Sequence, residues 1–215
     1  MLKCFKECQN NYGVGDKSSN EWPNNAISHK ATFDSEAGMI HQTGVIEPSE
    51  HYKNSLINMK TEDLDLCRHL TVELDARFGE LEVGMGSESS DVFRSFWLRC
   101  PWPPPRIIDE KVIRHAFNNC IHPKAIITID PLTRDEDTFW QDVKKDLMGS
   151  VEEETQLVKW DAMMDWFANQ TELFSPSFVK INSDTGTTFC VMPRMAVAVT
   201  RGGGLVGLFG NCVRT

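Results

Sequence analysis

Two short histidine–threonine motifs contain residue types that could do chemistry. His41 and Thr43 flank one residue in the first motif, and His69 and Thr71 flank one residue in the second. Each motif lies in a stretch that predicts a β-strand, and the segment between them predicts a helix. A strand–helix–strand unit lays its two strands near each other and parallel. Two histidines that face one phosphate group can act as general acid and general base, while threonine hydroxyls hold the phosphate oxygens.

This arrangement resembles the paired H-x-[ST] motifs of the 2H phosphodiesterases. The resemblance covers six residues and implies hydrolysis of a phosphodiester, with His41, Thr43, His69 and Thr71 as the catalytic residues. The alternative is a pair of strand histidines with no catalytic role. No metal ion or other cofactor is expected, because the Cys and His residues between positions 100 and 122 form no C-x-x-C or H-x-x-x-H pair.

The clearest structural signal is a predicted pair of helices between Pro131 and Thr171. Thr133 and Ser150 each begin an S/T-x-x-E sequence, which is the capping box of a helix N-terminus. Apolar residues then recur at helical spacing, which predicts one buried face on each helix: Phe139, Val143 and Leu147, then Leu157, Trp160, Met164 and Phe167. Gly149 suits a helix C-terminus, so the link is short and the pair is predicted to form an antiparallel αα-hairpin.

The predicted hairpin is strongly acidic. The whole chain has a net charge of −9, and residues 133–172 contain eleven acidic and four basic residues, a net charge of −7. General nucleic-acid binding is not expected, because contacts from Lys and Arg to phosphates supply most of that affinity. The acidic helices are a candidate docking surface for a basic protein partner, with Glu152, Glu153, Glu154, Asp161 and Asp165 as the binding residues. The alternative is a solvated helical face.

A proline-rich stretch is a second candidate binding segment. Pro101, Pro104 and Arg106 fit the pattern of a polyproline ligand with a basic end, which aromatic-lined grooves of other proteins recognise. The alternative is a rigid connector within the folded chain, because proline fixes the backbone in an extended conformation.

The cysteines and the lengths of the apolar runs indicate the cellular compartment in which the protein is expected. The seven cysteines are odd in number and scattered, which favours reduced thiols over a disulfide framework. The N-terminus lacks the apolar core of a signal peptide, and no apolar run approaches the ~20 residues of a membrane-spanning helix. We therefore expect a cytoplasmic protein. Cys4 and Cys8 lie beside lysines, so S-acylation of these two residues, as a lipid anchor, is an alternative to ordinary thiols.

The predicted fold class is α+β: a mostly antiparallel sheet with the αα-hairpin packed on one face. Residues 1–38 predict a flexible polar tail, and residues 39–215 a single domain. Two further helices are expected, at 49–67 and 109–119. The predicted strands are 39–46, a β-hairpin of 70–74 and 81–85, 125–129, 178–181, 187–192, 195–200 and 205–213. The last two are apolar on both alternations, which places them inside the sheet, and Gly202 to Gly204 form the turn between them.

The function that this pattern favours is a non-catalytic interaction or regulatory protein. It would bind a protein partner through the acidic helical hairpin and an aromatic rim. A phosphodiesterase that uses the two His-x-Thr motifs is the alternative. A small-ligand-binding domain, with a pocket between the sheet and the helices, is a further alternative.

Overall fold

A five-stranded antiparallel sheet forms the centre of the protein. The computed structural model describes residues 59–83, 92–100, 103–117, 121, 125–148, 153–182 and 191–213. The strand order is β1-β5-β4-β3-β2, and every neighbouring pair is antiparallel. The strands are β1 (Arg94–Arg99), β2 (Ile126–Pro131), β3 (Leu173–Asn182), β4 (Val191–Thr200) and β5 (Gly204–Val213). The α+β class with a mostly antiparallel sheet is therefore confirmed.

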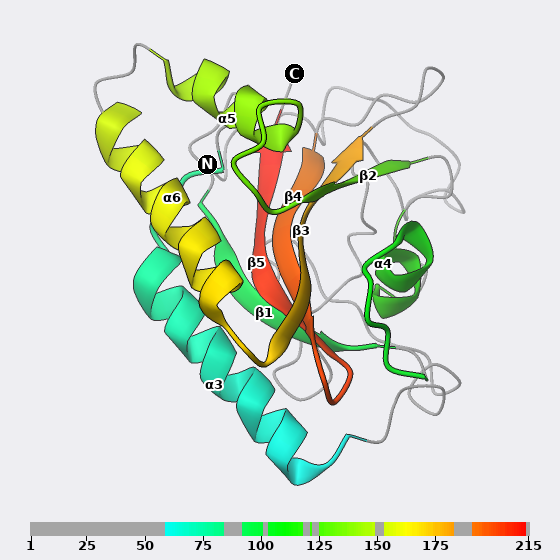
Figure 1. The fold of residues 1–215 in the computed structure, drawn as a ribbon. Helices are drawn as coiled ribbons and strands as arrows, with labels where there is room; N and C mark the ends of the chain where they lie inside the picture. The colour runs from blue at the N-terminus through cyan, green and yellow to red at the C-terminus, as the bar shows by residue number, and fades with distance from the viewer. Residues whose placement is uncertain are drawn as a thin grey trace, which may run out of the picture.

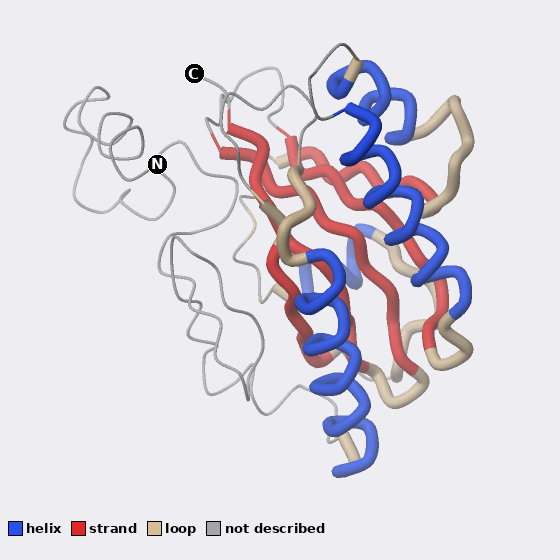
Figure 2. Tube along the Cα trace, turned by 90° about the vertical axis from the view of Figure 1, so that its left-hand side faces the viewer, coloured by secondary structure: helices blue, strands red, loops and turns tan. Residues whose placement is uncertain are grey.

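Helices of the described ranges cover both faces of this sheet (Figure 1), and three of them pack on one face. The helices are α3 (Thr61–Phe78), α4 (Glu110–Ala116), α5 (Phe139–Leu147) and α6 (Glu153–Asn169). One apolar cluster joins residues of α3, α5 and α6 to one face of the sheet, and a second joins α4 to the other face. Figure 2 shows α3 and α6 as two long helices in front of the sheet. The long helices therefore form an outer layer on one side.

The strands β4 and β5 lie inside the sheet, as predicted. Their side chains are almost all buried, because each strand has a neighbour on both sides and apolar residues on both faces. The turn between them has Gly203 at a φ of 88°, a backbone conformation that glycine adopts readily. A Cβ atom at Gly204 would overlap the Sγ atom of Cys67 on α3. The glycines therefore serve both the turn and the close approach of α3.

The predicted β-hairpin of residues 70–74 and 81–85 is wrong. Residues 61–78 form the continuous helix α3. Its buried residues are Cys67, Leu70, Leu74 and Phe78, at spacings of three and four. Val72, which the strand pattern placed on the buried face, is 69% exposed. Burial of the helical stripe against β1 and β5 outweighs the local alternation of apolar and polar residues.

The helices predicted between Pro131 and Thr171 are present as α5 and α6, but the first begins later than expected. Thr138, and not Thr133, is the N-cap of α5, and its hydroxyl accepts a hydrogen bond from the backbone N–H of Trp140 at 3.5 Å. The core residues predicted on α6 are buried or partly buried. Residues 149–152, which include Ser150 and would form the turn of the hairpin, lie outside the described residues.

The helix predicted at 109–119 is confirmed as α4. Its N-cap is Asp109, whose carboxylate accepts a hydrogen bond from the backbone N–H of Val112 at 2.8 Å. The predicted strand 125–129 is confirmed as β2, and 178–181 as part of β3. The predicted tail, the strand 39–46 and the start of the helix 49–67 fall within residues 1–58, which are outside the described part of the chain, as are residues 183–190. None of the helices in the described ranges combines the length and apolarity needed to cross a bilayer.

Candidate functional site: an acidic stripe on α6

The two predicted catalytic motifs do not share the expected strand–helix–strand unit. His69 and Thr71 lie on α3, and the Thr71 hydroxyl donates a hydrogen bond to the backbone carbonyl of Cys67 at 2.7 Å. This is the usual local bond of a helical threonine, and it satisfies the hydroxyl within the helix. His69 is exposed on the same helix. His41 and Thr43 lie outside the described residues. The strand predicted at His69 is therefore wrong, and the parallel arrangement inferred from it is lost.

The docking residues predicted on α6 lie along one exposed stripe of that helix. Glu154, Val158, Asp161 and Asp165 are separated by four, three and four residues, so they share one face. Glu154 and Asp165 are exposed and Asp161 is partly exposed. Val158 lies between them with 62% of its surface exposed. We call these four residues the α6 stripe. Glu152 lies outside the described residues, and the side chain of Glu153 is not described.

Arg134 binds the C-terminal half of the stripe. Its Nε lies 2.6 Å from the Asp161 Oδ1, and one terminal nitrogen lies 2.8 Å from the Asp165 Oδ1. These two hydrogen bonds raise the pKa of the arginine above its ordinary value. All three side chains are roughly half exposed, so solvent screens the pairs and each contributes little to stability. Arg134 therefore partly neutralises Asp161 and Asp165 and leaves Glu154 as the acidic end of the stripe.

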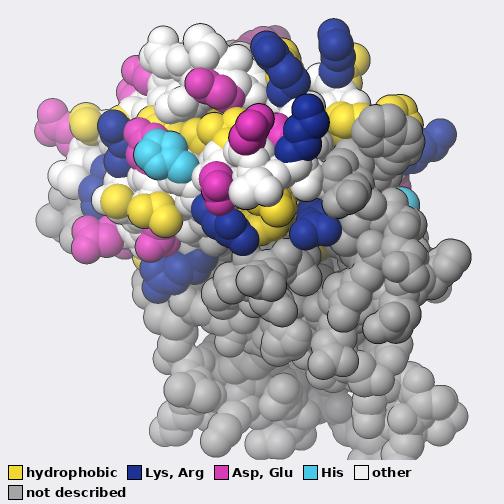
Figure 3. Space-filling model, turned by 90° about the horizontal axis from the view of Figure 1, so that it is seen from below, with side chains coloured by type: hydrophobic (Ala, Val, Ile, Leu, Met, Phe, Trp, Pro, Cys, Tyr) yellow, Lys and Arg dark blue, Asp and Glu magenta, His cyan; other side chains and the backbone are white. Residues whose placement is uncertain are grey.

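The negative charge of the outer layer comes from α3 as well as α6. The two helices together carry nine acidic and three basic residues, a net charge of −6, whereas α5 carries two of each sign. Their side chains meet through Trp166, whose indole N–H donates to the Glu73 carboxylate at 3.0 Å and whose ring packs edge-on against Phe78. Seen from below, acidic, basic and apolar side chains are interspersed on the described surface (Figure 3). The two helices are acidic in sum, although Arg68, Arg77 and Lys159 lie among their acidic residues.

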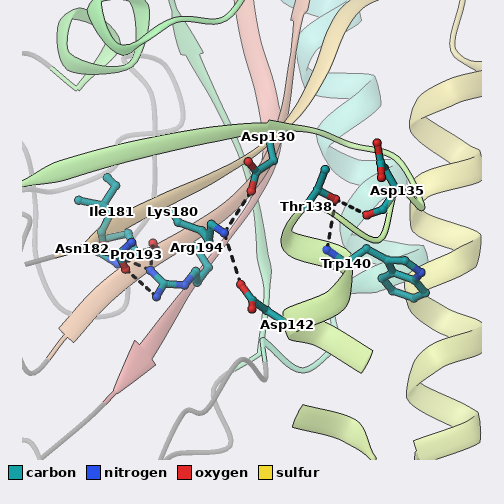
Figure 4. Close-up of polar contacts among 10 residues, drawn as sticks. All are labelled: Asp130, Asp135, Thr138, Trp140, Asp142, Lys180, Ile181, Asn182, Pro193 and Arg194. Atoms are coloured by element: carbon teal, nitrogen blue, oxygen red, sulfur yellow. Dashed lines mark hydrogen bonds and ion pairs between the residues drawn. The ribbon is translucent and has the colours of Figure 1, made fainter. Parts of the chain in front are cut away.

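A second polar cluster, which the sequence reasoning missed, lies between the sheet and α5 (Figure 4). The Lys180 ammonium lies 3.1 Å from the Asp130 Oδ2 and 3.4 Å from the Asp142 Oδ2, so it joins β3 to both β2 and α5. Arg194 lies opposite Lys180 on β4 and is 4% exposed. Its guanidinium group donates hydrogen bonds to the carbonyls of Ile181 and Pro193 and to the amide oxygen of the Asn182 side chain.

This cluster has the character of a structural connection. The two carboxylates match the charge of the two bases, so the cluster has no net charge with which to attract an ionic ligand. One terminal nitrogen of Arg194 bonds to two backbone oxygens, and the other bonds to the Asn182 side chain. The sequence did contain one signal of this cluster: two basic residues, Lys180 and Arg194, lie inside otherwise apolar strands. Such residues need partners when they are buried. Here Lys180 joins α5 to the sheet through Asp142, and Arg194 bonds to residues of β3 and β4.

Two of the described thiols, Cys67 and Cys100, do not have the properties of nucleophiles. Cys67 and Cys100 are fully buried, and burial raises the pKa of each thiol to about 12. A thiolate is the reactive form of cysteine, so both side chains are protonated and inert at neutral pH. Within the described ranges, no group of three or more His, Cys, Asp and Glu side chains is arranged to hold a metal ion.

The proline-rich stretch has no helix or strand in its described part. Pro104 is partly buried and Arg106 is exposed, while Pro101 lies outside the described residues. The stretch leads into the N-terminus of α4, and the backbone N–H of Ile108 donates to the Ser175 hydroxyl of β3 at 3.2 Å. This contact joins the connector to the sheet.

Comparison with known proteins does not assign a family or a function to this chain. No model of a known protein family matches the chain, and no curated protein has a significantly similar sequence. The α6 stripe, which brings together three of the predicted docking residues, is therefore the candidate binding surface among the described residues.

Proposed function

We propose that this is a non-catalytic interaction or regulatory protein that binds a basic protein segment through the acidic layer of α3 and α6. The observation that supports the proposal is the α6 stripe, in which Val158 is exposed between acidic residues at helical spacing. A large exposed aliphatic side chain offers apolar contact area, and the acidic residues around it select a partner with basic residues.

The energetics favour a broad contact over a single helix face. An exposed ion pair contributes about 0.2–1 kcal/mol, and complete burial of a valine side chain about 1.5–3 kcal/mol. Three such pairs and Val158 alone would barely offset the entropy lost on association. The partner must therefore also contact α3, which supplies five further acidic residues beside α6. We also propose that α5 and α6 form one antiparallel αα-hairpin, and that this hairpin holds the acidic layer on the sheet.

Charge reversal with a matched control tests the proposal. The probe is a panel of synthetic helical peptides rich in Lys and Arg, and fluorescence anisotropy measures binding at low and physiological salt. Glu154→Lys should weaken binding about tenfold, because one attraction becomes a repulsion. Asp137→Lys changes the net charge equally at an exposed acidic residue before α5 and should change affinity less than twofold. Affinity should fall with salt, since exposed charges are screened over about 8–10 Å.

The valine contributes the apolar part of the interaction and has its own control. Val158→Ser should weaken peptide binding about fivefold through lost apolar contact. Ile107→Ser alters an aliphatic residue of similar exposure in the connector before α4, which is not part of the acidic layer, and should have a smaller effect. Equal effects of Glu154→Lys and Asp137→Lys would contradict the proposal, because only the net charge would then matter.

The phosphodiesterase alternative makes a separate prediction. It requires His41 to face His69 across the outer surface of α3. If the two histidines form an acid–base pair, His69→Ala should reduce hydrolysis of a cyclic phosphodiester by about 10²–10⁴-fold with the fold intact. Absence of hydrolysis by the unaltered protein would leave the interaction function as the proposal.

A further inference from the structure

The strand β2 forms one edge of the described sheet, and it is less covered than β1 at the other edge (Figure 1). All six residues of β2 are exposed or partly exposed, whereas Phe96, Trp97 and Leu98 of β1 are buried. Ile126 at the start of β2 has 49% of its surface exposed. Of the two edges, β2 is therefore the one that another chain can reach.

The register of β2 on β3 shows which backbone groups point away from the sheet. The backbone N–H of Leu132 donates to the carbonyl of Pro176 on β3 at 3.0 Å. In an antiparallel pair, residues alternate between those that bond to the neighbouring strand and those that point their backbone groups away from it. Counted back in steps of two from Leu132, the even-numbered residues of β2 bond to β3. Ile127 and Ile129 therefore present their N–H and C=O groups at the outer edge.

The outer edge is closed at both ends and open in the middle. The carbonyl of Ala125 accepts a hydrogen bond from the Arg114 guanidinium at 2.7 Å. The carbonyl of Pro131 accepts one from the backbone N–H of Thr133 at 2.9 Å, and proline has no N–H to donate. Within the described ranges, nothing bonds to the outward groups of Ile127 and Ile129. We call the N–H and C=O groups of these two residues the open edge.

The open edge lacks the features that keep edge strands from pairing. Natural proteins protect an edge with charged side chains, above all lysine, or with a proline or a bulge inside the strand. Asp130 is the only charged residue of β2, and it is already paired with Lys180 at 3.1 Å. Pro131 comes after the open groups. The remaining four residues of β2 are isoleucine and threonine, which favour strand pairing.

We propose that the open edge binds an extended segment of a partner protein as an added antiparallel strand. The antiparallel direction matches every other pair of the sheet and gives the more stable ladder. The segment has aliphatic residues opposite Ile127 and Ile129, because these two side chains pack against the apolar cluster under α4 and an aliphatic neighbour extends it. The edge is not part of the acidic layer, so this inference does not depend on the proposed function.

The charge beside β2 selects the end of the segment. The loop after β2 contains Asp135 and Asp137, which are exposed and form no ion pair within the described ranges. An antiparallel segment places its N-terminal end beside this loop, so basic residues at that end fit best. A second copy of the chain fits less well, since two open residues on each copy make an interface far below the ~1,200 Å² of a stable complex.

An eight-residue peptide tests this inference. It has two lysines at its N-terminus, followed by Ser-Thr-Val-Thr-Val-Thr, and fluorescence anisotropy measures its binding to the unaltered protein. In the proposed register the two valines exchange hydrogen bonds with Ile129 and Ile127. N-methylation of both valine nitrogens should weaken binding about tenfold or more, because two hydrogen bonds are lost. N-methylation of the two threonines that follow the valines alters nitrogens that point away from β2 and should change affinity less than about threefold.

Two protein variants locate the site. Ile126→Lys adds a lysine at an exposed position of the edge and should weaken peptide binding about fivefold. Glu154→Lys alters the α6 stripe and should change the affinity less than about twofold, which separates the edge from the acidic layer. Absence of binding, equal loss from the two methylated peptides, or binding abolished by Glu154→Lys would overturn the inference. Dimerisation of the protein alone, measured by sedimentation and lost in Ile126→Lys, would overturn the assignment to a partner segment.

Discussion

Replacement of Trp160 by alanine should remove a large part of the stability of the domain. Trp160 is fully buried on α6, and its ring lies 5.5 Å from Phe93, 5.8 Å from Phe178 and 6.2 Å from Phe139, measured between centroids. These three rings belong to the segment before β1, to β3 and to α5. The indole therefore joins α6 to the sheet and to the neighbouring helix.

The expected magnitude follows from this packing. Deletion of a buried Trp or Phe side chain costs about 3–5 kcal/mol, as the sum of lost transfer free energy and the cavity left behind. Each well-oriented aromatic pair adds about 0.5–1.5 kcal/mol, and Trp160 takes part in three. We therefore expect a loss in the upper half of that range. This is a large share of the ~5–15 kcal/mol that stabilises a typical domain.

Urea unfolding followed by circular dichroism measures the effect, with Trp160→Phe and Val158→Ala as controls. Trp160→Phe keeps an aromatic ring and should cost about 1–2 kcal/mol. Val158→Ala alters an exposed residue of the same helix and should change the free energy of unfolding by less than about 0.5 kcal/mol. A loss below about 1 kcal/mol for Trp160→Ala, with an unchanged denaturant slope, would refute the packing of α6 on the sheet.

Three further predictions concern other parts of the fold. Gly204→Ala should cost about 1–3 kcal/mol in urea unfolding, because the new Cβ overlaps the Cys67 Sγ and α3 must shift. Thr138→Ala should cost about 1 kcal/mol and Thr133→Ala less than about 0.5 kcal/mol, since only the former caps α5; the reverse order would contradict this assignment. Cys67 and Cys100 should resist iodoacetamide at pH 8 in the native protein and react in urea, as read by mass spectrometry of their peptides. Burial raises both thiol pKa values from 9.0 to about 12, so the stability that the two buried thiols contribute is complete below pH 9 and is lost between pH 9 and 12. A free energy of unfolding that does not change between pH 9 and 12 would be inconsistent with their burial.

The strands near the C-terminus were predictable because their sequence has only one consistent interpretation. Residues 195–200 and 205–213 are apolar at both alternations, and three glycines separate them. Only a strand with neighbours on both sides and helices on both faces buries every one of these side chains, and this is where β4 and β5 lie.

The segment of α3 was misinterpreted because it fits two periods. Leu70, Val72 and Leu74 alternate as in a strand, but Cys67, Leu70, Leu74 and Phe78 repeat as in a helix. The longer pattern is the stronger signal, and Glu62 and Asp63 in the first turn also favour a helix start. A similar competition occurred at α5, where Thr138 and Gln141 also fit a capping box, five residues after the one that we selected.

The candidate site was only partly accessible to sequence reasoning. Helical spacing alone places Glu154, Val158, Asp161 and Asp165 on one face, but it cannot show that the face points to solvent or that Arg134 binds two of its acids. The bond between Trp166 and Glu73 was beyond reach, because these residues lie 93 positions apart in the chain. Only the tertiary packing of α6 beside α3 brings them together.

Site-specific photo-crosslinking at position 158 tests the central claim most directly. A photoreactive amino acid at Val158 lies in the middle of the α6 stripe, and the same group at Ile107, which is 73% exposed in the connector before α4, is the control. In extract from the native source, position 158 should form a discrete adduct with a basic protein segment, and Glu154→Lys in the same chain should lower the yield of this adduct about tenfold. Adducts of equal yield at positions 158 and 107, or an adduct at 158 whose yield Glu154→Lys leaves unchanged, would contradict the assignment of this stripe as the partner-binding surface.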